Sequence, residues 1–180
     1  MSGAAAHRQP VLAAAVPAHS EVARYVADSD FHDCYQMNIE PTSRSALALY
    51  LDVVARTPGW VNRLMALRNR VVGLFGLKNL GHLNGATTLR PAGEYKLGDR
   101  VGIFSILYLS EAEVILGDTD KHLKVRVSVR KLGEPRSAIA VSTVVHIHNL
   151  LGRLYMLFVA PVHKRIVPAV LGRYRAGDAL

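Results

Sequence analysis

The stretch EVILGDTDKHLKVRVSVRK, residues 113–131, decides the fold class. Its second half alternates between apolar and polar residues, which is the pattern of a half-buried strand. The turn-forming residues 117–120 separate it from an apolar run that also has the composition of a strand. The stretch therefore predicts an antiparallel hairpin with one apolar face. That face carries Leu123, Val125, Val127 and Val129, and the opposite face carries His122, Lys124, Arg126, Ser128 and Arg130.

The charges of this hairpin predict its register. A turn over residues 117–120 brings opposite charges together on the outer face, each pair contributing about 0.2–1 kcal/mol. The pairs we expect are Leu116 with Lys121, Glu113 with Lys124 and Glu111 with Arg126.

Further strands and helices follow outward from the hairpin. Residues 31–39 alternate as a strand in which Asp33 lies on the apolar phase, and residues 100–109 and 138–148 are rich in β-formers. Thr42 or Ser43 is expected to cap a helix that ends near Pro58. A second helix has an apolar stripe at helical spacing, made of Trp60, Leu64, Leu67, Val71, Leu74 and Phe75.

Residues 150–175 return to helical spacing and are apolar almost all round in their first half. We expect such a helix to be enclosed on several sides. Pro161 and Pro168 predict bends rather than an end to the helix. The order of elements predicts an α+β, helix-grip fold: a curved antiparallel sheet wrapped around a long C-terminal helix, with two short helices after the first strand.

Composition bounds the class of protein. The 180 residues are 50% hydrophobic and 20% charged, which suits one folded domain over residues 21–175 after a flexible leader over residues 1–20. Cys34 is the only cysteine, so no disulfide forms within the chain and a cytoplasmic setting is expected. The apolar run at residues 154–162 is shorter than the roughly 20 residues of a membrane span, so no stable membrane insertion is expected.

The net charge of +8 falls in the last third of the chain, where residues 121–180 hold 11 Lys and Arg against two acids. Such asymmetry indicates either an anionic partner or a solvated basic face. Nucleic-acid binding is not expected, because the basic third lacks interleaved aromatic residues and a recognition-helix motif.

Four stretches carry a resemblance to a known group: PGWVNRLMALRN (58–69), EVILGDTDKHL (113–123), LKVRVSVRK (123–131) and HIHNLLGRLYMLFVAPVHK (146–164). They resemble a bacterial domain-of-unknown-function family within the START-like, polyketide-cyclase-like (SRPBCC) superfamily. The resemblance implies a ligand held between the sheet and the last helix. Relatives also occur behind a nicotinamide-nucleotide-binding domain, but this chain has no G-x-G-x-x-G after a strand, so no cofactor is expected.

Several residue clusters were weighed for chemistry. His146 and His148 lie on one strand face, and a metal site would need further ligands, for which His163 or His122 is the nearest candidate in the sequence. The alternative is a pair of half-exposed outer-face histidines, and no metal is expected. Asp118, Asp120 and His122 either act as acids and bases or, as the structural alternative, build the turn. No serine-hydrolase, P-loop or zinc-protease motif is present, so catalytic residues stay unassigned.

The function we expect is binding of a hydrophobic or lipid-like molecule. A cyclase or isomerase reaction in the same pocket stays open. So does a role as a partner domain for a nucleotide-binding oxidoreductase, and so does pairing with another protein or a second copy. The candidate pocket residues are Trp60, Arg68, Asn69, His122, Tyr155, Phe158 and His163.

Overall fold

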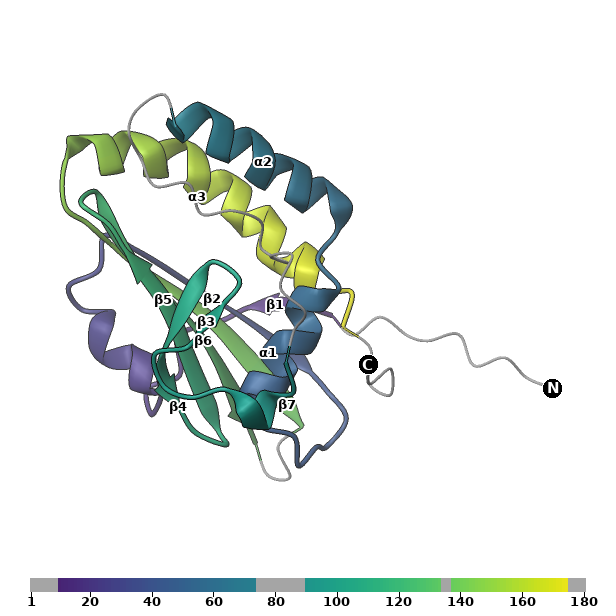
Figure 1. Ribbon diagram of the computed structural model, residues 1–180. Coiled ribbons are helices and arrows are strands. Elements are labelled where there is room, and N and C mark those ends of the chain that lie inside the picture. The colour runs from purple at the N-terminus through teal and green to yellow at the C-terminus, as the bar shows by residue number, and fades with distance from the viewer. Residues whose placement is uncertain (1–9, 74–89, 134–136, 175–180) are drawn as a thin grey trace.

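A computed structural model describes residues 10–73, 90–133 and 137–174, which form a seven-stranded antiparallel sheet with three α-helices (Figure 1). The strands lie in the order β1-β2-β7-β6-β5-β4-β3. Their bounds are β1 Leu12–Ala13, β2 Phe31–Asn38, β3 Arg100–Val101, β4 Phe104–Leu109, β5 Glu113–Thr119, β6 Leu123–Leu132 and β7 Ala138–Ile147. The helices are η1 Glu21–Tyr25, α1 Ala46–Ala55, α2 Gly59–Gly73, η2 Ala92–Glu94 and α3 Leu150–Leu171. The predicted α+β class, with a long C-terminal helix packed on a curved antiparallel sheet, is confirmed.

Pairing between β2 and β7 joins the predicted first strand to the last one, from Phe31 opposite Val145 to Asn38 opposite Ala138. Because side chains alternate along each strand, the register defines two faces of the sheet. We call the face that carries Asp33, Val127 and Thr143 the inner face; α1 and α3 lie on this side. The outer face carries Glu113, Arg126, Ser128 and Ser142.

Helix α1 fills one end of the inner face. Eight of its ten residues are buried, and it contacts β5 and β6. Its N-cap is Ser45, whose hydroxyl accepts from the backbone N–H of Ala48 at 3.2 Å. The predicted cap at Thr42 or Ser43 is wrong, because Thr42 instead accepts from the backbone of Arg44 in the turn before the helix.

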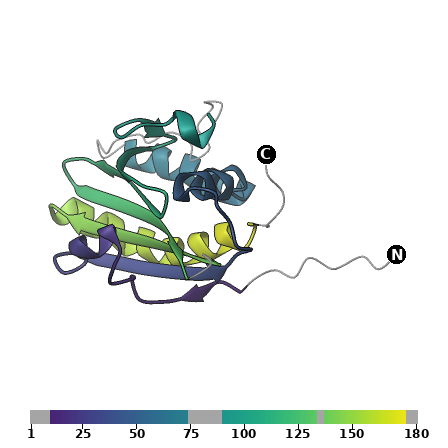
Figure 2. The same ribbon diagram turned by 90° about the horizontal axis from the view of Figure 1, so that it is seen from below.

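Helix α3 lies along the inner face and contacts β2 and α1 (Figures 1 and 2). Asn149 caps its first turn by accepting from the N–H of Gly152. The helix continues through Pro161 and Pro168, as predicted, and ends with Leu171 fully buried in the core. A buried leucine of this kind stabilises the fold by roughly 1.5–3 kcal/mol, so the C-terminal end of α3 is firmly attached.

The N-terminal segment extends the sheet and covers part of its outer face. β1 pairs with β2, placing Leu12 opposite Gln36, and η1 packs against β5 and β7. Residues 12–13, which we assigned to the flexible leader, are therefore part of the sheet.

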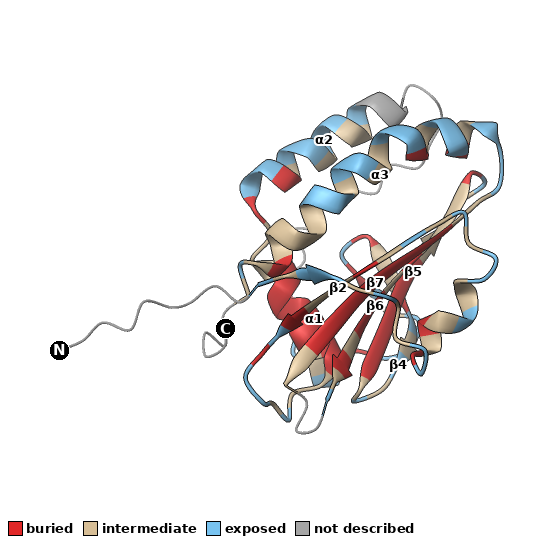
Figure 3. Ribbon diagram, turned by 180° about the vertical axis from the view of Figure 1, so that it is seen from behind, coloured by how far each residue is buried: buried red, intermediate tan, exposed pale blue. Residues whose placement is uncertain are grey.

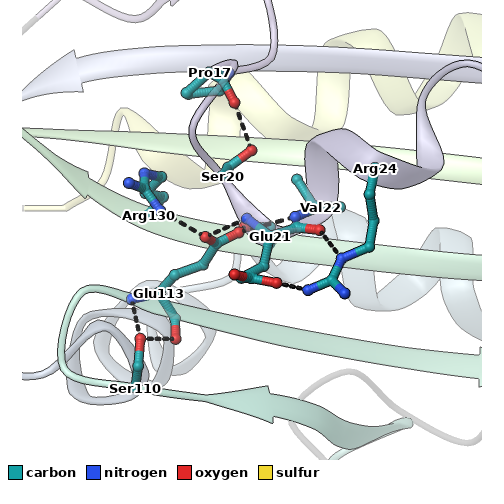
Figure 4. Close-up of polar contacts among 9 residues, drawn as sticks. Pro17, Ser20, Glu21, Val22, Arg24, Ser110, Glu113 and Arg130 are labelled. Carbon is teal, nitrogen blue, oxygen red and sulfur yellow. Dashed lines mark hydrogen bonds and ion pairs between the residues drawn. The ribbon is translucent and has the colours of Figure 1, made fainter.

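Buried Glu113 fastens η1 to the outer face (Figure 4). Its carboxylate accepts from the backbone N–H groups of Glu21 at 2.8 Å and Val22 at 3.3 Å. It also accepts from the Ser128 hydroxyl at 2.7 Å and pairs with Arg130 at 2.8 Å. A buried carboxylate is stable only when paired and hydrogen-bonded, and all these donors meet that need.

The predicted hairpin of β5 and β6 exists, but the register that we predicted for it is wrong. Leu116 lies opposite Val127, six residues from the predicted Lys121. Glu113 lies opposite Arg130 rather than Lys124, and Thr119 is the residue opposite Lys124.

The physical reason is the position of the turn. Gly117, Asp118 and Thr119 continue strand β5, and the chain reverses after Asp120. The Asp120 carboxylate accepts from the backbone N–H groups of His122 at 2.7 Å and Leu123 at 2.9 Å. This is the structural role of an aspartate in a turn that we weighed for the Asp118–Asp120–His122 cluster.

Candidate functional site

A polar array joins α3 to the inner face at Asp33 on β2, Thr143 on β7 and His163 on α3. The register places Asp33 opposite Thr143, and α3 holds His163 against both. The Nδ1 atom of His163 lies 3.0 Å from Asp33 Oδ2, and its Nε2 atom lies 3.4 Å from Thr143 Oγ1. In the neutral ring, Nδ1–H donates to the carboxylate, which leaves the Nε2 lone pair toward the hydroxyl. A carboxylate-oriented imidazole can tether a helix, and it can also act as a general base.

The Asp33 carboxylate can accept a further hydrogen bond, because its Oδ1 atom is buried and has no hydrogen-bond partner among the described residues. A hollow of about 550 Å³ beside β1 and β2 is lined by Asp33, Tyr35 and Lys164, among others.

His122 forms a second buried polar group, at the N-terminal end of α3. Its side chain is 7% exposed, and Nδ1 lies 3.1 Å from Asn149 Oδ1. Because that oxygen also accepts from the N–H of Gly152, His122 donates through Nδ1 and keeps an acceptor at Nε2. Nε2 is buried without a hydrogen-bond partner in the described part of the chain.

Arg68, Asn69 and Tyr155 connect α2 with α3. Arg68 Nε donates to the Tyr155 hydroxyl at 3.1 Å, and its guanidinium lies 5.4 Å from the centre of the Tyr155 ring. Arg68 Nη1 donates to Asn69 Oδ1 at 2.9 Å. The buried acid Asp52 on α1 is paired with Arg44.

Trp60 and Phe158 lie on the surface of the helices. Trp60 is 42% exposed and Phe158 is 67% exposed. They belong to a larger set of exposed apolar side chains on α2 and α3. Figure 3 shows in pale blue that much of both helices is exposed. The set is Trp60, Leu64, Leu67, Leu150, Leu154, Leu157, Phe158 and Val162.

The expectation that the last helix is enclosed on several sides is therefore wrong. Only Gly152, Met156 and Leu171 of α3 are buried. By length and composition alone, α3 is also the one described helix that could cross a membrane. Helix α2 also leaves its apolar stripe uncovered at Trp60, Leu64 and Leu67. Leu74 and Phe75 of that predicted stripe lie outside the described residues.

The burial of the inner face decreases along the central strand β6, from Val129 toward Val125. Val129 is 1% exposed in the core that α1 covers. Val127 and Val125, which point to the same face, are only half-buried although strands flank β6 on both sides. Solvent therefore reaches part of the Val125 and Val127 side chains at this end of the inner face.

The structure separates the two histidines that we weighed as a metal pair. His146 faces Arg126 on the outer face, and His148 contacts the backbone oxygen of Asp120. Burial, and then the charge of Arg126, lower the pKa of His146. Among residues 10–73, 90–133 and 137–174, no three His, Cys, Asp or Glu side chains gather as metal ligands.

Asp33 and Thr143 were missed as partners of His163. An acid on the apolar phase of residues 31–39 was the available signal, because an inward-facing carboxylate requires a partner. Thr143 gave no comparable signal, since a threonine is ordinary in a strand.

Comparison with known proteins gives one family. A family model described as "Protein of unknown function (DUF2867)" matches residues 25–170. No curated protein and no solved structure matches the chain. The matched region runs from the end of η1 through most of α3 and so contains buried His122 and the Asp33–His163 contact. The chain therefore belongs to the DUF2867 family of proteins of unknown function.

Proposed function

We propose that this domain binds a hydrophobic, lipid-like small molecule between α3 and the inner face of the sheet. The observation that carries the proposal is the half-burial of Val125 and Val127, apolar residues in the middle of the sheet. Apolar side chains at such a position are ordinarily covered, and a ligand would remove their remaining surface from water. The resemblance to START-like proteins favours the same location.

The polar groups beside this layer suggest the chemistry of the ligand. Asp33 Oδ1 and His122 Nε2 are both buried acceptors without a hydrogen-bond partner among the described residues. Leaving such an atom unsatisfied costs about 1–3 kcal/mol. A ligand that carries a hydroxyl or amide donor on an apolar body would remove part of this cost.

The exposed surface of α3 is consistent with an apolar cargo. Leu154, Leu157 and Phe158 are each more than half exposed. Patches of this kind on soluble domains mark contacts with lipids, ligands or proteins. An apolar molecule could be taken up across this side of the domain.

The test uses a fluorescent long-chain alcohol as the probe and two matched variants. Val125→Trp should fill the space beside the inner face and weaken probe binding about tenfold or more, since it displaces the ligand. Leu157→Ser removes an exposed apolar side chain of α3 and should leave binding within about twofold. Thermal unfolding checks that both variants fold.

Two results would overturn the proposal. One is the absence of probe uptake, together with no apolar molecule in denaturing mass spectrometry of the purified protein. The other is retained binding in Val125→Trp with loss in Leu157→Ser, which would place the probe on the outside of α3.

A reaction in the same layer is the second candidate, favoured by the Asp33–His163 geometry. The imidazole would take a proton from a bound ligand at Nε2 while Asp33 stabilises the resulting charge. The molecule extracted from the protein is incubated with wild type and with His163→Gln. Conversion by wild type alone supports catalysis, and no conversion by either protein leaves binding as the function.

A further inference from the structure

The outer face carries a hollow of about 540 Å³ that the ligand proposed above does not use. It lies between η1 and strands β4, β5 and β6. Its lining includes the cationic residues Arg24, Lys124 and Arg126 and the aromatic residues Tyr25 and Tyr108.

Arg126 is the unusual member of this lining. It lies on the central strand and is only 8% exposed. Its guanidinium stacks on the Tyr25 ring, 3.8 Å from the ring centre, and its Nη1 atom lies 3.4 Å from His146 Nδ1. No Asp or Glu of the described residues forms an ion pair with it.

Arg130 provides the comparison within the same strand. It faces the same side, four residues further on, and pairs with the buried carboxylate of Glu113 at 2.8 Å. A buried cation normally has such a counter-ion, because its desolvation costs several kcal/mol. Arg126 has a neutral imidazole and an aromatic ring instead.

The remaining charges of the hollow are also positive on balance. Arg24 is paired with Glu21, so its charge is offset. Lys124 has no ion-pair partner among the described residues. Asp118 lines the hollow, but the register places its side chain on the inner face with Val125. Arg126 and Lys124 thus leave two positive charges without a carboxylate.

We propose that this outer hollow binds a small phosphate-bearing molecule. Arg126 and Lys124 hold the doubly charged phosphate, and the organic part lies against Tyr25, Tyr108 and Leu107. A guanidinium binds phosphate through paired N–H donors, and a lysine adds a mobile point charge. The neighbouring hydroxyls of Ser105 and Thr119 supply further donors.

The test is calorimetric titration of the full chain with phenyl phosphate, with phenylacetate as the carboxylate comparison. Wild type should bind phenyl phosphate and unfold at a higher temperature in its presence. Lys124→Met should weaken binding about tenfold, and Arg126→Met should abolish it. Arg70→Met removes an exposed cation on α2 and should leave binding unchanged.

Several results would overturn the site. One is the absence of phenyl phosphate binding, and another is equal binding by wild type and Lys124→Met. A third is a loss of binding in Arg70→Met as large as that in Lys124→Met, which would mean non-specific electrostatic attraction. Tighter binding of phenylacetate would overturn the choice of phosphate. If Arg126→Met does not fold, Lys124→Met and the NMR shifts of the Tyr25 ring decide the question. Because the hollow lies on the outer face, its failure leaves the proposed function of the inner face untouched.

Discussion

The outer face of the sheet contains fully buried polar residues, whereas the inner face contains apolar residues that are only partly buried. The outer face carries Glu113, Ser128 and Ser142, polar residues that are each 1% exposed. The inner face carries Val125 and Val127, apolar residues that stay half-buried. The difference follows from what covers each face: η1 is fastened to the outer face through Glu113, whereas α3 has only three buried residues. The outer face is therefore tightly covered around Glu113, whereas the inner face is tightly covered beneath α1 and less so at Val125 and Val127.

The largest effect should come from breaking the outer face at Glu113. Glu113→Gln keeps the size of the side chain but leaves Arg130 without its anion and weakens the bonds to η1. Breaking one partner of a buried pair costs about 3–5 kcal/mol. Chemical denaturation measures this free energy of unfolding.

Glu111→Gln is the matched control, because Glu111 is an exposed glutamate that lies close to Glu113 in the sequence. Its effect should stay within about 0.5 kcal/mol. Equal losses in the two variants would show that Glu113 does not fasten the outer face.

The next effect concerns the contact of α3 with the hairpin. A Cβ atom at Gly152 would lie 2.5 Å from the backbone oxygen of His122. Gly152→Ala should therefore destabilise the protein by about 1–3 kcal/mol, although alanine favours a helix. Gly93→Ala is the control, since its Cβ meets nothing within 4 Å. A Gly152→Ala protein as stable as wild type would mean that α3 shifts freely on the inner face.

These positions show how far the sequence predicted the fold. The strands and helices followed from their periods, because alternation and helical spacing are local properties. The register failed because Gly117 and Asp118 have turn composition yet continue β5, and the turn depends on the side chain of Asp120. His163 was predicted as a pocket residue without a partner, because Asp33, which it contacts, lies 130 residues away in the sequence. Only the long-range pairing of β2 with β7 brings Asp33 and Thr143 together.

A smaller effect is expected for the link between Asp33 and His163. Asp33→Asn and His163→Gln should each destabilise the fold, and the double variant should show a coupling of about 0.5–1.5 kcal/mol. A double-mutant cycle by denaturation measures it. Zero coupling would mean that the contact between Asp33 and His163 does not help to hold α3 on the sheet. An effect of either single variant on ligand binding would then not be a consequence of lower stability.

The smallest effect is a pH dependence at Cys34, which lies on the outer phase of β2 and is buried. Burial raises the pKa of this thiol above its ordinary value of 9.0, with the charge of Asp33 adding to the rise. The folded chain then keeps its proton at a pH where the unfolded chain has lost it. The contribution to stability is complete below the ordinary pKa and declines as the pH rises past it. The unfolding free energy of wild type should therefore fall slightly more than that of Cys34→Ala between neutral and strongly alkaline pH. Equal slopes would mean that solvent reaches the thiol, so the outer face would be less tightly covered at β2 than at Glu113.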